Sequence, residues 1–244
     1  MKFQNSIVQK EEEADLRDVD IGLRASSRCS MPYFLEIIKT VRKCPHMMKL
    51  VDEMGFQELL LLDDCNVPRG FSQRIADKCS FGEDNTIIIH KTIVLNATSV
   101  QDTFAIPSGD IQVDADDEEE GKLAFLGTFA LTGLPSIKYF GNMITNDKLP
   151  DKVFKRCFMV VALGTFLCPT SSTKPSTKYL GALVDVDSIG DLNWCKFVHD
   201  WLLCYIRKYH KDKLKGNRMS VTLGGCIYHL AVSLFFFFLC FCLL

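Results

Sequence analysis

The sequence lacks the motifs that mark the commonest enzyme families. It contains no G-x-x-x-x-G-K-[ST] phosphate loop, no G-x-G-x-x-G turn, no H-E-x-x-H pair and no G-x-S-x-G elbow. These absences argue against nucleotide, dinucleotide, zinc-peptidase and α/β-hydrolase chemistry. We therefore expect a protein that is not an enzyme, with no catalytic residues, no cofactor and no small-molecule substrate.

The sequence also lacks an excess of charge of either sign. Its 28 Lys and Arg and 30 Asp and Glu leave a net charge of −2, which predicts no general attraction to nucleic acid or acidic lipid. Charge is concentrated locally, with acidic residues in 11–20 and 110–120 and basic residues in 207–218. The basic run contains one aromatic residue, Tyr209, so a nucleic-acid partner is not expected.

A secretory signal and metal-binding cysteine spacing are missing as well. The first residues, MKFQNSIVQKEEEADLRD, include no apolar core, so the eleven cysteines should be free thiols in a reducing compartment. No C-x-x-C occurs, and the best ligand-like set is Cys195, His199, Cys204 and His210. These four side chains fall on different faces of one predicted helix, which favours buried thiols over zinc.

Two further candidate sites have simpler explanations. Cys65 in LLLDDCNVP lies beside two carboxylates, which raise a thiol pKa and disfavour a nucleophile. The acidic stretch DADDEEE departs from the calcium-loop pattern and is expected to be a solvated loop. The five histidines that could act as bases are His46, His90, His199, His210 and His229.

Helical periodicity dominates the chain and predicts a mainly α fold. Residues 1–30 are expected to be a flexible charged N-terminus, and 31–220 one irregular multi-helix domain with an acidic loop at 110–121. Proline lies in the expected first turns of helices that start near 31 and 45. The run NTIIIHKTIVLN predicts one small hairpin at 86–95, and Thr98 or Ser99 is expected to cap the next helix. The predicted core includes Phe56, Leu60, Phe104, Phe158, Leu163, Trp194 and Trp201.

The strongest amphipathic helix covers DLNWCKFVHDWLLCYIRKYHK. Its aromatic and apolar residues recur every three or four positions, at Trp194, Phe197, Val198, Trp201, Cys204 and Tyr205. Such a stripe is typical of a core face more often than of a cofactor site or a partner groove.

The last 24 residues, 221–244, carry no formal charge and form a hydrophobic C-terminal segment. Residues 226–244 are long enough for a transmembrane helix, and the basic run before them predicts a single-pass protein with a cytosolic N-terminal domain. The alternative is that SLFFFFLCFCLL is an intron translated in error, since its residues have pyrimidine-rich codons. The protein is then expected to be nuclear or cytoplasmic.

The residues of two long stretches resemble a known family. LVDEMGFQELLLLDDCNVPRGFSQRIADKC and FKRCFMVVALGTFLCPTSSTKPSTKYLGALVDVDSIGDLNWCKFVHDWLLCYI are similar to the helical domain of transposon-associated plant proteins. That domain is known as the aminotransferase-like plant mobile domain, or as the region upstream of SUMO-protease-like cysteine peptidases. The resemblance covers about residues 30–232.

The resemblance implies a lineage and no reaction. Relatives with a peptidase carry a separate C-terminal domain with a His, Asp and Cys triad, which has no counterpart here, and no lysine lies in a pyridoxal-phosphate context. We therefore expect a binding or scaffolding module with an unidentified protein partner. The alternative is a truncated SUMO-protease-like peptidase with residual or lost activity.

Overall fold

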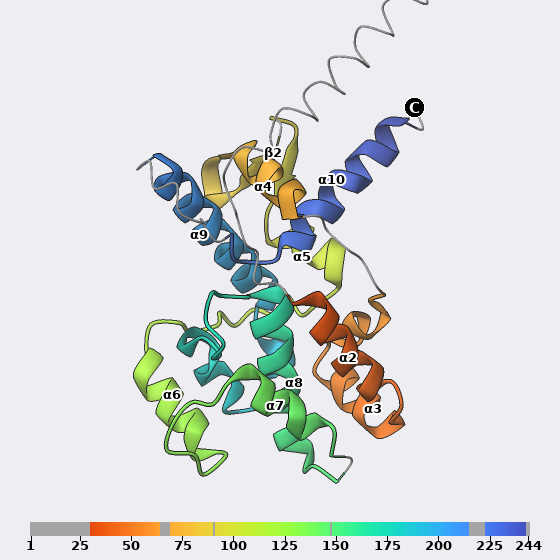
Figure 1. Cartoon of the computed structure of the whole chain (residues 1–244), viewed down its shortest axis with the longest axis vertical. Helices are drawn as coiled ribbons and strands as arrows, with labels where there is room; N and C mark the ends of the chain where they lie inside the picture. Colours follow the sequence, from red (N-terminus) through yellow and green to blue (C-terminus); the bar gives the residue numbers. More distant parts are fainter. Residues whose placement is uncertain (1–29, 64–68, 90, 147, 215–222, 243–244) are drawn as a thin grey trace, which may run out of the picture.

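The protein is mainly helical, with one small sheet (Figure 1). The computed structural model describes residues 30–63, 69–89, 91–146, 148–214 and 223–242. The predicted N-terminal segment 1–30 therefore lies, except for Ser30, outside the described residues. The α-helices are α2 (Met31–Val41), α3 (Pro45–Glu53), α4 (Arg69–Asp77), α5 (Ala97–Phe104), α6 (Glu118–Gly127), α7 (Ile137–Ile144), α8 (Asp151–Ala162), α9 (Trp194–Leu214) and α10 (Ile227–Cys242).

Proline fixes the start of the first two helices. Pro32 and Pro45 lie in the first turns of α2 and α3, as the sequence predicts, because a first-turn residue needs no N–H for the helix ladder. After Gly55 the chain forms the 3-10 helix η1 (Gln57–Leu61). The apolar stretch KYLGALVDV contains two 3-10 turns, η4 (Thr177–Tyr179) and η5 (Gly181–Leu183).

Helix α8 lies at the centre of the molecule and is buried on almost every side. It continues without a break into a π-helical turn, η3 (Leu163–Leu167). Two charged residues are buried with it. Lys155 forms a 2.8 Å ion pair with Glu53, and Arg156 donates to the carbonyls of Leu183 and Val184. Lys155 therefore has a counter-charge and Arg156 has hydrogen-bond acceptors, and these interactions offset the cost of burying the two charges.

The predicted hairpin is present but belongs to a larger sheet. Strands β2 (Ile87–Ile89) and β3 (Ile93–Leu95) pair antiparallel, and β1 (Cys79–Phe81) adds a third strand on the other side of β2. The sequence prediction of a lone hairpin is therefore wrong by one strand. In the sequence, Phe71, Ile75 and Cys79 are four residues apart, which is a helical spacing. This pattern hides the change from helix to strand that the structure shows after Asp77.

Two local predictions need correction. Asn96, and not Thr98 or Ser99, caps α5, because its side chain accepts the Ser99 N–H while the Ser99 hydroxyl accepts the Asn96 N–H. The acidic loop ends earlier than predicted, since α6 begins at Glu118. Carboxylates in a first turn face the positive end of the helix dipole, which stabilises that start.

The predicted core is confirmed, since all seven residues named from the sequence are buried. Helix α9 runs from this core to the upper part of the molecule in Figure 1, where the sheet, α4 and α5 lie. At 1.5 Å per residue its 21 residues extend about 32 Å. It therefore supports both parts of the fold.

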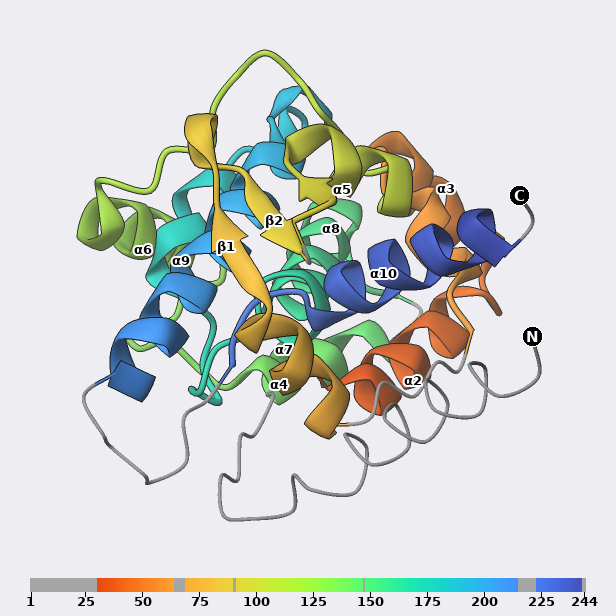
Figure 2. The same cartoon turned by 90° about the horizontal axis from the view of Figure 1, so that it is seen from above.

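The C-terminal hydrophobic helix is present as α10, whose first turns pack on α4 and α5 (Figure 2). No helix in the part of the chain that the structure describes is long and apolar enough to cross a membrane, so the predicted transmembrane span is not found there. Its 16 residues extend about 24 Å, and Ile227, Tyr228 and Leu230 at its start belong to the domain core.

Candidate functional site

A surface groove runs along the outer face of α9. It has a volume of about 430 Å³, and its long wall is formed by Phe197, Trp201, Cys204, Tyr205 and Lys208. Rings four residues apart stack into a column, with centroid distances of 5.6 Å from Phe197 to Trp201 and 5.9 Å from Trp201 to Tyr205. Because 3.6 residues make one turn, this spacing keeps the three rings on one face.

The opposite wall comes from the segment that was predicted to be a solvated acidic loop. Val113 and Ala115 line the groove and are half-buried, while Asp114 and Asp116 between them are exposed. This alternation is that of an extended chain lying on a surface. A backbone bridge between Ile111 and Leu192 holds the segment beside the start of α9.

The loop after Cys168 also lines the groove. It contributes Thr170, Ser176 and Lys178. The Ser176 side chain accepts the N–H of Lys178, and the Tyr179 hydroxyl accepts the N–H of Ser176. This capping arrangement fixes the loop above Trp201, whose ring lies 6.3 Å from that of Tyr179.

Two lysines give the groove its charge. Asp200 also lines it, but its carboxylate pairs with Lys196 on the same helix. Lys178 and Lys208 are exposed and form no ion pair within the described residues. Because the Asp200 carboxylate is neutralised by Lys196, the charges of Lys178 and Lys208 have no counter-charge among the residues that line the groove.

Trp201 is the polar residue at the groove whose hydrogen bonding is incomplete. Its side chain is 8% exposed, and its indole Nε1 is buried without an acceptor. The other tryptophan, Trp194, donates to the carbonyl of Ile189 at 2.8 Å. A buried N–H without an acceptor costs roughly 1–3 kcal/mol.

The four residues considered for zinc do not converge. Cys195 Sγ bonds to the Ile106 carbonyl, His199 Nε2 to the Asn85 carbonyl and His210 Nε2 to the Ala76 carbonyl. Cys204 is exposed in the groove. Within the described residues, no three His, Cys, Asp or Glu side chains are grouped so that they could hold a metal ion.

Most of the described thiols are buried, and burial raises their pKa values. The pKa of Cys195 is raised to about 11, and those of Cys79, Cys157 and Cys226 to about 12. A thiol of this kind remains protonated at neutral pH and is a poor nucleophile. Cys65, which was considered as a nucleophile from the sequence, lies outside the described residues.

The structure also brings together a serine–histidine pair that the sequence did not indicate. Ser99 Oγ lies 3.0 Å from His229 Nε2, and Thr103 Oγ1 lies 3.2 Å from His229 Nδ1. His229 is fully buried, and burial lowers its pKa to about 3. Such an imidazole is a weak base, and the Ser99 hydroxyl already accepts the Asn96 N–H at the start of α5, so the pair is better explained as a link between α10 and α5. Residues 130 positions apart give no local sequence signal for this contact.

Another cavity lies at the start of α2 and α7 and has a volume of about 680 Å³. Its lining includes the hydroxyl groups of Ser30, Ser136 and Thr165. The Tyr33 ring also lines it, and burial raises the pKa of the Tyr33 hydroxyl. The wall contains one carboxylate and one lysine, so charge does not select a ligand class here.

These features define a class: a mainly helical protein with an aromatic surface groove and no metal cluster in its described residues. The family model of a domain of unknown function, DUF8566, matches residues 27–231. The chain therefore belongs to the DUF8566 family. No curated protein and no solved structure shows significant similarity to it.

Proposed function

We propose that this chain is a non-catalytic binding module that holds a segment of a partner protein in the groove along α9. The observation that carries the proposal is the aromatic column, in which Phe197 and Tyr205 are half-exposed on either side of Trp201. Aromatic residues are typical anchors of protein interfaces.

The spacing of the column favours an extended segment. Successive rings are four helical residues apart, a rise of about 6 Å. Alternate residues of an extended strand are about 6.6 Å apart, so side chains at positions i and i+2 would reach neighbouring ring gaps. The charges of Lys178 and Lys208 favour acidic residues between or beside these apolar side chains.

The resemblance to transposon-associated plant proteins supports a binding role of mobile-element origin. In those relatives the helical domain accompanies a separate catalytic domain. The described thiols with raised pKa values give no support to catalysis here. We therefore propose scaffolding, and not peptidase activity, as the role of this domain.

A peptide-binding measurement tests the proposal. The probes are fluorescein-labelled heptapeptides in which Leu or Phe alternates with Asp or Glu, compared with peptides of the same composition in separate apolar and acidic blocks. We expect the alternating peptides to bind more tightly, as measured by fluorescence anisotropy. Cys204→Gln should weaken binding about tenfold by filling the groove at an exposed position, and Lys208→Glu should weaken it by a similar factor.

Matched substitutions outside the groove provide the controls. Met48 in α3 and Lys39 in α2 are exposed. Met48→Gln introduces the same glutamine at another exposed position, and Lys39→Glu repeats the same charge reversal elsewhere. Neither should alter affinity. Equal affinity for alternating and block peptides, or equal losses from groove and control substitutions, would contradict the proposal.

The rival function, a SUMO-protease-like peptidase, has a direct test of its own. A SUMO vinyl-sulfone probe labels the nucleophilic cysteine of such enzymes covalently. We expect no adduct by intact-mass measurement at neutral pH. An adduct that a single Cys→Ser substitution abolishes would establish the rival function and overturn ours.

A further inference from the structure

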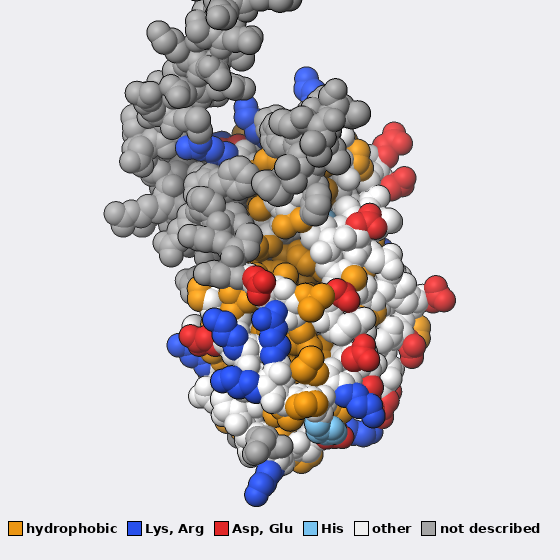
Figure 3. Space-filling model, turned by 90° about the vertical axis from the view of Figure 1, so that its right-hand side faces the viewer, with side chains coloured by type: hydrophobic (Ala, Val, Ile, Leu, Met, Phe, Trp, Pro, Cys, Tyr) orange, Lys and Arg blue, Asp and Glu red, His pale blue; other side chains and the backbone are white. Residues whose placement is uncertain are grey.

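A second depression lies on another side of the molecule, between η1 and the end of α5. It has a volume of about 300 Å³, and Leu59, Leu61, Leu62 and Phe104 form much of its apolar lining. Leu61 is 69% exposed, although it lies in a turn whose other leucines are buried or half-buried. On the side that carries α2 and α3, hydrophobic side chains form a band between acidic and basic side chains (Figure 3).

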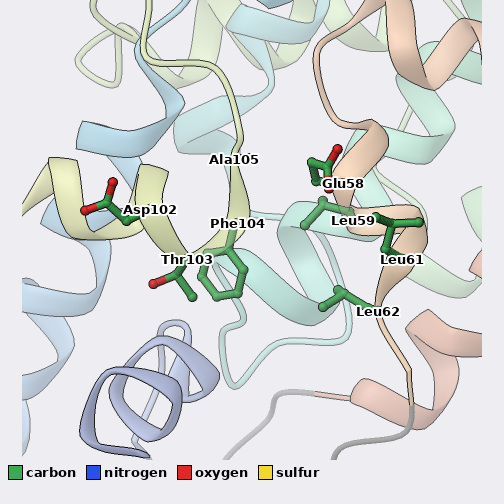
Figure 4. Close-up of a pocket in the computed structure, with 8 residues that line it drawn as sticks. All are labelled: Glu58, Leu59, Leu61, Leu62, Asp102, Thr103, Phe104 and Ala105. Atoms are coloured by element: carbon green, nitrogen blue, oxygen red, sulfur yellow. The ribbon is translucent and has the colours of Figure 1, made fainter. Parts of the chain in front are cut away.

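Carboxylates stand on opposite sides of the depression. Glu58 belongs to η1 and Asp102 to α5, and the Phe104 ring lies between these two elements (Figure 4). Both carboxylates are exposed, and neither forms an ion pair within the described residues. The depression therefore has an apolar centre and two acidic edges.

The chain's own arginine at this turn is already occupied. Arg42 donates to the carbonyls of Leu60 and Leu62, and its other nitrogen lies 3.7 Å from Asp63. It therefore does not neutralise Glu58 or Asp102. The depression therefore presents the apolar side chain of Leu61 and, at its edges, the two unpaired carboxylates. This pattern is complementary to an apolar residue that is flanked by basic residues.

We propose that this depression binds a partner segment in which one apolar side chain lies between two arginines. The apolar side chain would cover Leu61 and Leu62, and the guanidinium groups would pair with Glu58 and Asp102. Arginine fits better than lysine, because its guanidinium is more weakly hydrated and can bond to a carboxylate through two parallel N–H groups. This surface is separate from the groove along α9, and the two proposals can fail independently.

The test uses the acetylated, amidated pentapeptide Gly-Arg-Leu-Arg-Gly and its analogue with both arginines replaced by citrulline. Citrulline keeps the size and shape of arginine and removes its charge. Methyl NMR spectra of the whole chain, labelled at leucine, would follow the signals of Leu61 and Leu62 during titration. We expect saturable shifts with the arginine peptide and about three- to tenfold weaker binding of the citrulline peptide, the range for two exposed ion pairs.

The double variant Glu58→Gln with Asp102→Asn should lower the affinity for the arginine peptide by the same factor and leave that for the citrulline peptide unchanged. Glu36→Gln with Glu119→Gln, two exposed carboxylates outside the depression, is the matched control and should leave both affinities unchanged. The proposal is overturned if the two peptides bind equally, if both double variants have the same effect, or if the Leu61 and Leu62 signals do not shift.

Discussion

The stability of the domain should depend on pH through its most deeply buried histidine, His229. His229 lies at the start of α10 with no exposed surface, and both of its ring nitrogens contact hydroxyls of α5. Burial, and to a lesser degree the nearby His199, lowers its pKa from 6.5 to about 3. The folded protein therefore holds a neutral imidazole over a range in which the unfolded chain binds a proton.

The sign and the size of the effect follow from this difference. Above pH 6.5 both states are neutral at this position, and His229 contributes no pH dependence. Between pH 6.5 and 3 the unfolded chain binds one more proton, so the free energy of unfolding falls by about 1.4 kcal/mol per pH unit. Acidification from pH 7.5 to 4.5 should thus cost about 2.7 kcal/mol through this residue alone.

Urea denaturation followed by circular dichroism, at half-unit steps from pH 7.5 to 4.5, measures this slope. His229→Gln removes the titrating group and keeps an amide that can bond to Ser99 and Thr103, so its curve should flatten relative to wild type by about 2.7 kcal/mol over the acidic range. Thr103→Val is the control, since it removes a hydrogen bond and keeps the histidine. It should lower stability at every pH without flattening the curve.

One result would refute the reasoning. Both hydroxyls can accept a hydrogen bond from a protonated ring, and such pairing favours the charged form. If it offset the effect of burial, the folded-state pKa would lie near 6.5. The wild-type and His229→Gln curves would then run parallel through the acidic range.

Two substitutions test close packing and a buried cation elsewhere. Gly109→Ala should lower the free energy of unfolding by about 1–3 kcal/mol, because an added Cβ would lie 1.9 Å from the Asp191 carbonyl oxygen. Gly133→Ala is the control: an added Cβ there meets nothing within 4 Å, so the free energy should change by less than about 0.5 kcal/mol. Equal effects of the two substitutions would contradict this reasoning. Arg156→Met should lower the free energy of unfolding by about 2–4 kcal/mol in the same urea assay, because it leaves the carbonyls of Leu183 and Val184 without their donor. A loss below about 0.5 kcal/mol would show that these hydrogen bonds contribute little to stability.

The helices were predictable because their signals are local. Proline in the first turns of α2 and α3 and a repeat of three to four residues in α9 need no knowledge of the rest of the chain. The third strand was not predictable in this way. β1 has three residues and acquires its identity from pairing with β2 across a turn in which Asp84 and Asn85 have positive φ.

The groove was only half visible in the sequence. The stripe on α9 was interpreted as a core face, and this is correct for Trp194 and Val198, which are buried. It is incomplete for Phe197 and Tyr205, because exposure depends on which distant segment covers each ring. That segment is the acidic loop, whose alternate residues Val113 and Ala115 pack beside the helix, and composition alone predicts only a solvated loop.

The C-terminal segment and the groove are physically connected. Gly224 lies against the ring of Tyr205, where an added Cβ would be 2.5 Å from two ring carbons. The next residue, Gly225, has φ +82°, and an added Cβ there would be 2.9 Å from the Leu202 Cα. Because only glycine allows both the close approach and the left-handed conformation, this pair holds the chain against the rear of α9 just before α10 begins. Tyr205 therefore has the groove on one side and the path to α10 on the other, and the hydrophobic end of the chain helps to fix the position of the aromatic column.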